Sequence, residues 1–579
     1  MWPFTSNESA SIIAQKRQQR EKLLQEVANA SPEEHTSILR ARASEIVDKI
    51  QAREWSASMV LEAYIIRTTY AHRQTNCLTE VMFESARETA RGLDAEFATT
   101  GRLKGPLHGV PVSIKEHFNV AGFDTTDGYT AWANQPEKNN ADVVDAILAA
   151  GGVPFVKTNV PQGVLAFESN NPLWGRTTNP YNPAYSSGGS SGGDSVLLAM
   201  DGCPISIGTD AGGSSRIPAS YCGIYSLKPG SGRISNVGIK DEMPGCDAIE
   251  AISCPMGRSV DDIDVMCRAL FGIPGKDNKV APLAYRDTAL PSKLRIGYYL
   301  TDNCIKPSPA CQRAVLETVK ALRDQGHECI EIDLPDISAA LSVYIGAVSS
   351  DGFETMLKPI GHDPRDDTSR LALLGASLPS FIRNIAVWGV KKFARDNFYA
   401  NTFHADRKKS VIEYWRIISL KAELQRIFQE QVWDKYGIDT LIGPVQAVPQ
   451  LPNGGCVKFS ALAISTVIYN VADLPAGCIP VTRVDPSVDQ ITEDWVKSGG
   501  HGSSLLEHGI YHASDKIYDP ERSKGMPIDV QIIGKKWEEE KLLAVMKLAD
   551  EALGPRGFGP GSWELHKAEV SEKPADSKV

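Results

Sequence analysis

Two short segments rich in glycine and serine carry side chains that could act as nucleophiles. The first reads YSSGGSSGGD over residues 185–194, and the second reads GTDAGGSSRIP over residues 208–218. By composition alone, the first segment could be a flexible linker, and the second could be a tight turn with incidental serines. In the second segment, however, the residues from Ala211 to Ser214 place consecutive backbone N–H groups around one hydroxyl, as in an oxyanion hole. The pattern therefore indicates attack by a serine on a carbonyl carbon.

A serine nucleophile needs a base, which is most often a histidine oriented by a carboxylate. His108 and His117 are the histidines nearest in sequence to a strand end, but neither lies in a His/Asp arrangement that the sequence supports. Lys115 follows the apolar run GVPVSI, so we expect it to emerge at the end of a buried strand. Burial would lower the pKa of its amine and let it accept a proton. The alternative is an ordinary surface lysine at a strand end.

Three other chemistries are less well supported. His508 and His512 stand four residues apart, but without an HExxH pattern they are more typical of surface histidines, so we expect no metal site. The segment at 151–158 lacks the second glycine of a phosphate-binding loop, because Val156 stands in its place. The GxSxG match centred on Ser191 lacks the preceding apolar strand that a nucleophile elbow requires.

The elements that must position these residues alternate between strands and helices. Apolar runs at 110–114 and 153–158 are separated by the helical pattern ADVVDAILAAGG, which favours an α/β fold. Residues 56–72 are expected to form a helix capped by Ser56, and a long helical pattern covers 410–435.

Three further buried-strand candidates lie near the C-terminus. They are TLIGPV (440–445), AGCIPVTRV (476–484) and MPIDVQIIG (526–534). Between the last two lies a polar, glycine-rich stretch over 485–525, which we interpret as an insertion loop.

Composition, net charge and cysteine spacing indicate what kind of protein this is. Of 579 residues, 42% are hydrophobic and 23% are charged, which is ordinary for a soluble globular chain. The net charge of −10 argues against a nucleic-acid partner, and we interpret the basic run QKRQQREK near the N-terminus as a solvated helix face. Because the 11 cysteines are scattered, and because no signal peptide or membrane span is evident, we expect a cytoplasmic protein. Nothing calls for a cofactor.

The long run GGSSGGDSVLLAMDGCPISIGTDAGGSSRIPASYCGIYSLKP, at 188–229, resembles the signature segment of the amidase signature family. HGVPVSIKEHFNVAG (108–122) and MPIDVQIIGKKWEEEKLL (526–543) match other family motifs in the same order. The resemblance is greatest to fungal general amidases and acetamidases, and the chain is also similar to the fatty-acid amide hydrolase branch.

This resemblance implies an α/β fold with one large amidase signature domain over 51–560. A central twisted mixed β-sheet would be flanked by helices. A helical extension would precede this domain over 1–50, and a flexible tail would follow it over 561–579.

The resemblance also assigns roles in a Ser-Ser-Lys triad. Lys115 would be the base, Ser214 the nucleophile and Ser190 the bridging serine, held by a cis peptide. Val164 would contact substrate, and Ser191 would be left as a structural hydrogen-bonding residue. Apart from the resemblance, Asp210 and Arg216 carry opposite charges six residues apart and are expected to clamp the loop as a charge-assisted pair. Residues implied to bind the substrate or its oxyanion are Ala211, Gly212, Gly213, Ser214, Ser190 and Val164.

The function implied is hydrolysis of the C–N bond of a small carboxylic amide to an acid and ammonia or an amine, through an acyl-enzyme on Ser214. Three alternatives stay open: a fatty-acid amide hydrolase-like enzyme acting on long-chain amides, an ammonia-supplying subunit of a tRNA-dependent amidotransferase, and an inactive binding module. The sequence is also compatible with a homodimer.

Overall fold

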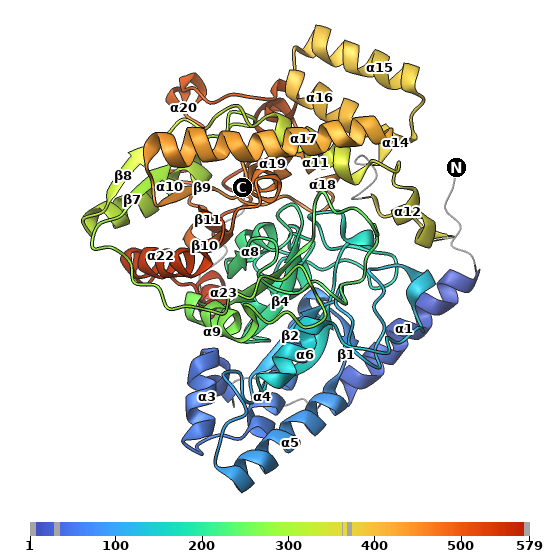
Figure 1. Cartoon of the computed structure of the whole chain (residues 1–579), viewed down its shortest axis with the longest axis vertical. Coiled ribbons are helices and arrows are strands. Elements are labelled where there is room, and N and C mark those ends of the chain that lie inside the picture. Colours follow the sequence, from blue (N-terminus) through green and yellow to red (C-terminus); the bar gives the residue numbers. More distant parts are fainter. Residues whose placement is uncertain (1–6, 28–34, 362, 368–372, 573–579) are drawn as a thin grey trace.

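One mixed sheet of eleven strands runs through the molecule (Figure 1). The computed structural model describes residues 7–27, 35–361, 363–367 and 373–572, and the strand order among them is β1-β3-β2-β4-β6-β5-β10-β11-β9-β7-β8. The strands are β1 Leu78–Val81, β2 Pro111–Lys115, β3 Val153–Thr158, β4 Ile205–Asp210, β5 Tyr225–Lys228, β6 Ile252–Gly257, β7 Arg295–Tyr298, β8 Glu328–Glu331, β9 Thr440–Pro444, β10 Ala476–Arg483 and β11 Pro527–Ile533.

Parallel pairs form two separate groups in this sheet, and β1 pairs antiparallel with β3 at one edge. β2 runs parallel to β3 and β4, and β7 runs parallel to β8 and β9. The strands between these groups pair antiparallel. Crossover helices connect the parallel strands, as the strand–helix–strand rhythm predicted. The expected α/β class and mixed sheet are therefore confirmed.

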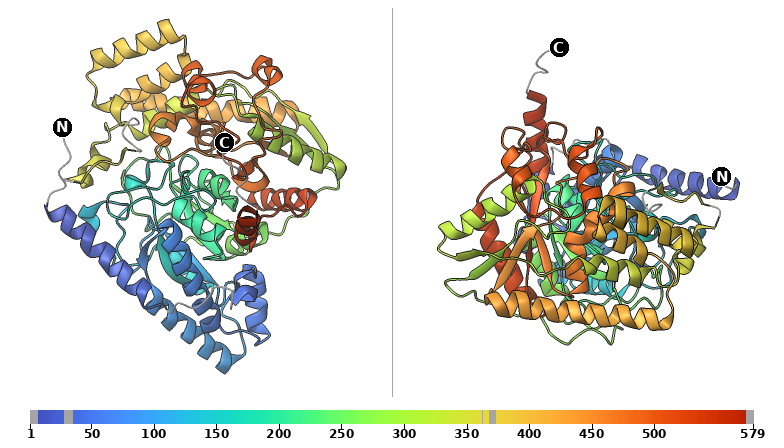
Figure 2. Two further views of the ribbon diagram at one scale, coloured as in Figure 1. Left: turned by 180° about the vertical axis from the view of Figure 1, so that it is seen from behind. Right: turned by 90° about the horizontal axis from the view of Figure 1, so that it is seen from above.

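Helices cover both sides of the sheet, and α17 runs along one side of the molecule (Figure 2). The helices are α1 Asn7–Gln25, α2 Thr36–Leu39, α3 Ala43–Gln51, α4 Ala57–Thr75, α5 Phe83–Thr100, α6 Asp142–Ala149, α7 Gly192–Ala199, α8 Arg216–Cys222, α9 Val260–Leu270, α10 Pro309–Asp324, α11 Ala339–Val348, α12 Glu354–Leu357, α14 Leu374–Ser377, α15 Ser380–Gly389, α16 Asn397–Ala405, α17 Val411–Phe428, α18 Cys456–Phe459, α19 Ile464–Val471, α20 Glu493–Lys497, α21 Ser504–Glu507, α22 Glu539–Leu553 and α23 Ser562–Glu572. No helix in the described ranges combines the length and apolar character that a membrane crossing requires.

The local signals in the sequence correspond to real element ends. Ser56 caps α4 by accepting a hydrogen bond from the backbone N–H of Met59, and Asn76 ends that helix in the left-handed conformation. β3 occupies the expected residues, and β2 extends to Lys115. The apolar runs in the sequence therefore predict the positions of strands β2 and β3.

The basic run on α1 is not a solvated face. Lys16 and Arg20 are each only 6% exposed, because α1 packs against the body of the protein. The Lys16 ammonium lies 2.8 Å from Asp124 and 2.5 Å from Glu80, while Arg20 donates to the carbonyl of Leu78. This part of the expectation was wrong because the cations are paired with buried acceptors.

The stretch over 485–525 is not a plain loop. It joins β10 to β11 and contains α20, α21 and a π-helical turn, η8 His508–His512. It is anchored by Lys306, whose ammonium donates to the carbonyl of Ser498 and lies over the ring of the buried Trp495.

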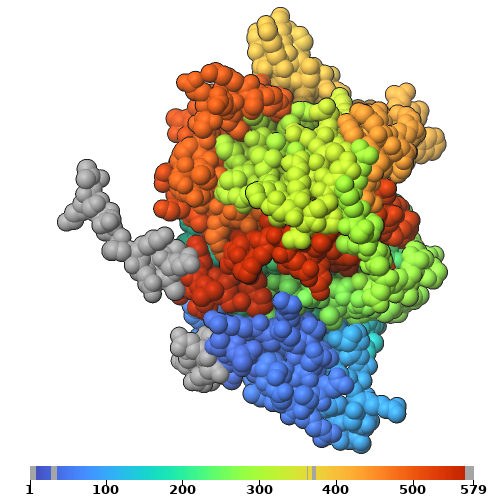
Figure 3. Space-filling view, turned by 90° about the vertical axis from the view of Figure 1, so that its left-hand side faces the viewer, coloured from blue at the N-terminus to red at the C-terminus, as the bar shows by residue number. Residues whose placement is uncertain are grey.

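The C-terminal residues also differ from a flexible tail. Residues 562–572 form α23, where Glu564 pairs with Arg67 of α4 and the Trp563 ring nitrogen donates to the carbonyl of Pro180. Residues 573–579 lie outside the described part of the chain. Figure 3 shows the red C-terminal segment lying directly against blue N-terminal helices.

A pair of helices, α15 and α16, projects from the body (Figure 1). α15 and the turn after it expose large apolar side chains, among them Phe381, Ile385, Trp388 and Phe393. α16 returns toward the body and packs on α11. The α15–α16 segment therefore carries an exposed apolar surface on α15 and contacts α11 through α16.

Candidate active site

The first glycine–serine segment is tightly packed backbone. Ser190 and Ser191 are fully buried. A Cβ on Gly193 would lie 2.4 Å from the backbone nitrogen of Asn159, so no larger residue fits there. Gly188 has a φ of 76°, which favours glycine. The segment is therefore a fixed support for Ser190 and not a linker, and the peptide bond before Ser190 is cis.

Lys115 is the last residue of β2, and its side chain is fully buried. Its Nζ lies 2.7 Å from the Oγ of Ser190 and 2.7 Å from the Oγ1 of Thr209. Burial lowers the pKa of Lys115 to about 8, against the opposing effect of carboxylates such as Asp194. The amine can therefore lose its proton near neutral pH and act as a base.

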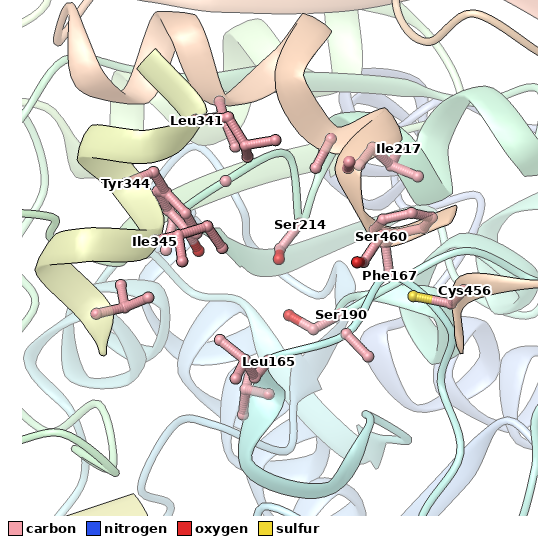
Figure 4. Close-up of a pocket in the computed structure, with 18 of the residues that line it drawn as sticks. Leu165, Phe167, Ser190, Ser214, Ile217, Leu341, Tyr344, Ile345, Cys456 and Ser460 are labelled. Carbon is pink, nitrogen blue, oxygen red and sulfur yellow. The ribbon is translucent and has the colours of Figure 1, made fainter. Parts of the chain in front are cut away.

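Ser214 is partly exposed in the loop between β4 and α8. Figure 4 shows the hydroxyl groups of Ser190 and Ser214 pointing toward one another in a cavity. The backbone N–H of Ser191 donates to the carbonyl of Ser214 at 3.0 Å. The structure thus brings Lys115, Ser190 and Ser214 together, and Ser191 supports the loop that carries Ser214.

The oxyanion loop differs in one detail from the sequence expectation. The N–H of Gly213 donates to a carboxylate oxygen of Asp210 at 2.7 Å, so it is not free for a substrate. The backbone N–H groups of Ala211, Gly212 and Ser214 have no acceptor within the described residues. Gly213 shapes the turn, with a φ of 121°, and the other three residues offer the donors.

Asp210 and Arg216 form the expected clamp. Both are fully buried, and the guanidinium binds the carboxylate through two contacts, at 3.0 and 3.1 Å. Burial alone would raise the pKa of Asp210, but the Arg216 charge and its hydrogen bonds hold the pKa well below its usual range. Arg216 also donates to Asn470, which ties the loop to α19.

The cavity above the serines is large and mostly apolar. It encloses about 1330 Å³ of space, part of which is open to solvent. Leu341, Tyr344 and Ile345 project into it from α11 (Figure 4), and Val164 lines it as the resemblance implied. Phe403 of α16 adds to the wall. The sequence gives no signal for the cavity residues of α11 and α16, because an apolar helix face looks the same whether it packs in the core or contacts a substrate.

A polar cluster beside Lys115 was also missed. His117 lies next to Asp127 and Glu242, an arrangement that no signal in the sequence indicated. Ligand atoms of these three residues lie within 4.8 Å of one another, although both ring nitrogens of His117 already face hydrogen-bond partners. Within the described residues, His508 and His512 are not part of such a group.

Comparison with known proteins agrees with this geometry. The family model described as Amidase matches residues 59–543. Amidase FG08078 of Gibberella zeae is 32% identical over 529 residues, covering 89% of this chain and 90% of the relative. Fatty-acid amide hydrolase 1 of Sus scrofa is 31% identical over 518 residues, covering 88% and 85% of the two chains.

A solved structure of a fatty acid amide hydrolase superposes on this fold with a TM-score of 0.80, at 25% identity, covering 96% of this chain and 92% of that one. The family model spans most of the chain, and both relatives are matched over at least 85% of their own length. These matches are consistent with the sheet order and with the cavity that holds Ser190 and Ser214. This chain therefore belongs to the amidase signature family and is an amidase.

Proposed function

We propose that this amidase works through Lys115, Ser190 and Ser214. Neutral Lys115 takes a proton from Ser190, which takes one from Ser214 as the Ser214 oxygen attacks the amide carbonyl carbon. The 2.7 Å contact between Lys115 and Ser190 is the observation that carries this assignment. Three backbone N–H groups, at Ala211, Gly212 and Ser214, would hold the oxyanion.

The leaving group departs by the reverse proton path. Ser190 returns a proton to the amide nitrogen, the C–N bond breaks, and ammonia or an amine leaves an acyl ester on Ser214. Water then attacks the ester carbonyl and gives up a proton toward Ser190 and Lys115, so that the acid is released and the serine is restored.

We also propose that the preferred substrates carry a sizeable apolar acyl or aryl group. The support is the apolar wall above the serines, to which α11 contributes Leu341, Tyr344 and Ile345 and α16 contributes Phe403; acetamide offers only a methyl group to such a wall. The fatty-acid amide hydrolases among the relatives fit such a substrate class.

A panel of amides tests this proposal. Acetamide, an aryl anilide and amides of increasing acyl length would be compared by release of ammonia or amine, with Ser214→Ala as the blank. We expect kcat/KM to rise with apolar acyl size. Equal turnover of acetamide and the larger amides would contradict the substrate proposal, while turnover by Ser214→Ala would contradict the assignment of the nucleophile.

We further propose a cytoplasmic location. The support is that the eleven cysteines are all unpaired and mostly buried, as is usual for a chain kept in a reducing compartment.

A further inference from the structure

The catalytic steps above leave one buried polar cluster next to Lys115 without a role. His117 follows β2 and is 1% exposed. Its Nδ1 lies 3.2 Å from the Oγ1 of Thr209, the same oxygen that contacts the Nζ of Lys115 at 2.7 Å. One hydroxyl therefore joins the imidazole of His117 to the amine of the proposed base.

One carboxylate lies at the other ring nitrogen of this imidazole, and a second carboxylate lies close to both. The Nε2 of His117 lies 3.1 Å from an oxygen of Glu242. Asp127 is fully buried beside them, and neither of its carboxylate oxygens has a hydrogen-bond partner among the described residues. An unpaired buried carboxylate is costly, so this arrangement favours a positive charge on the histidine.

The backbone fixes this arrangement in place. The N–H of Lys240 donates to the carbonyl of His117 at 2.8 Å, and the N–H of Asn119 donates to the carbonyl of Gly238 at 2.9 Å. These bonds hold the loop that carries Glu242 against the strand end that carries His117. Glu242 and His117 line both the main cavity and a second hollow beside it.

The charged groups around His117 and Lys115 favour a proton that these two residues share. Burial lowers the pKa of His117, but Asp127 and Glu242 more than offset this and raise it overall. Burial also raises the pKa of Asp127 to about 7. Outside the cluster, the charged residues that interact electrostatically with its members or with the adjoining Lys115 amine are Lys115 itself, Glu116, Lys157, Asp194, Asp210 and Asp241.

We propose that His117 stores the proton that Lys115 must lose before it can act as a base. The Lys115 ammonium gives one proton to the oxygen of Thr209 while the original hydroxyl proton of Thr209 moves to Nδ1 of His117. The products are a neutral amine, an intact hydroxyl and an imidazolium that faces Glu242 and Asp127. Atoms and charge balance, and the active form of Lys115 is reached without a proton leaving the site.

This proposal rests on the role of Lys115 as the base, and its test separates the two. The rate at which a fluorophosphonate labels Ser214 would be measured against pH in wild type, His117→Gln and the exposed-site control His512→Gln. Glutamine keeps hydrogen-bonding capacity but does not titrate in this range. We expect His117→Gln to shift the acid limb of the pH–rate profile to higher pH by about one unit, so that the labelling rate at a given pH on that limb is roughly tenfold lower. At high pH the labelling rates of the variant and the wild type should become equal.

The upward direction has a physical reason. Without His117 the proton has no internal acceptor, and the unpaired carboxylates of Asp127 and Glu242 favour the Lys115 ammonium. The control His512→Gln should keep the wild-type profile. An unmoved acid limb, or a rate lowered equally at every pH, would overturn the proposal, whereas labelling that survives in Lys115→Ala would overturn the assignment of the base instead.

A second measurement needs neither activity nor the folding of His117→Gln. ¹⁵N NMR of histidine-labelled wild type and Lys115→Ala would follow the protonation of the buried imidazole. Because coupled sites affect each other reciprocally, removing the Lys115 amine should raise the pKa of His117. An imidazole that stays neutral across the acid limb in wild type, or whose titration is the same in both proteins, would refute the proposal.

Discussion

The Nζ of Lys115 lies 2.7 Å from the Oγ of Ser190, although 75 residues separate them in the chain. Two independent features create this contact: a strand that ends at Lys115 and a glycine-rich turn that admits no larger side chains. The contact supplies a base that is close to its partner and buried enough to lose a proton.

Ser214→Ala is expected to lower kcat/KM by at least about 10⁴, because the attacking oxygen is removed. Fluorophosphonate labelling of the protein should be lost as well. Ser191→Ala is the matched comparison, since Ser191 lies next to Ser190 and contacts Ser214 only through its backbone N–H. That variant should still be labelled, and a loss of labelling as large as that in Ser214→Ala would contradict the division of roles.

Activity is expected to rise with pH through about 8, the value to which burial lowers the pKa of Lys115. The sign follows because only the neutral amine accepts a proton, and its population grows as pH rises through the lowered pKa. Lys115→Arg should be inactive throughout this range, since a guanidinium keeps its proton. A pH profile of single-turnover acylation checks this, and a Lys115→Arg enzyme with substantial acylation would exclude the lysine as base.

Asp210→Asn is expected to destabilise the fold by about 3–5 kcal/mol, because Arg216 would be left buried without its carboxylate. The low pKa of Asp210 makes the loss depend on pH: the ion pair stabilises the protein above the usual carboxyl range and weakens as pH falls. Denaturant unfolding at several pH values therefore should show the variant approaching wild type in acid.

A double variant separates stability from catalysis. Asp210→Asn combined with Arg216→Met removes both charges and should recover part of the lost stability. It should not recover activity, because Asp210 accepts from the N–H of Gly213 through one oxygen and from the N–H of Ser215 through the other, whereas asparagine has only one acceptor oxygen to shape the oxyanion loop. Full activity in the double variant would show that the loop keeps its form without the clamp.

Several parts of the fold could be predicted from local sequence. The run that ends at Lys115 is apolar on both sides, which identifies a buried strand in a parallel region. The oxyanion loop was identifiable because two glycines directly precede the hydroxyl of Ser214, although Ser215 follows it. These signals are short-range, and so they survive in a single sequence.

Other parts depend on contacts that the sequence does not display. Ser190 stands among several serines of the same segment, and only the family resemblance singled it out. The partner of His117 is Glu242, which lies 125 residues away in an irregular loop. The use of the Gly213 N–H by Asp210 depends on the direction of one carboxylate. Long-range packing therefore decides which polar groups are free for chemistry.

The cavity wall offers a test of substrate size that leaves the catalytic residues untouched. Ile345 projects into the cavity from α11, so Ile345→Trp should fill space that a long acyl group would occupy. We expect kcat/KM for long-chain amides to fall by about tenfold or more, while acetamide turnover changes little, because the serines and the oxyanion loop are unaltered. Leu316→Trp, on the exposed side of α10, is the matched control and should leave both substrates unaffected. If Ile345→Trp slowed all amides alike, the acyl group would have to lie elsewhere, and the apolar surface of α11 would be core packing and not a substrate wall.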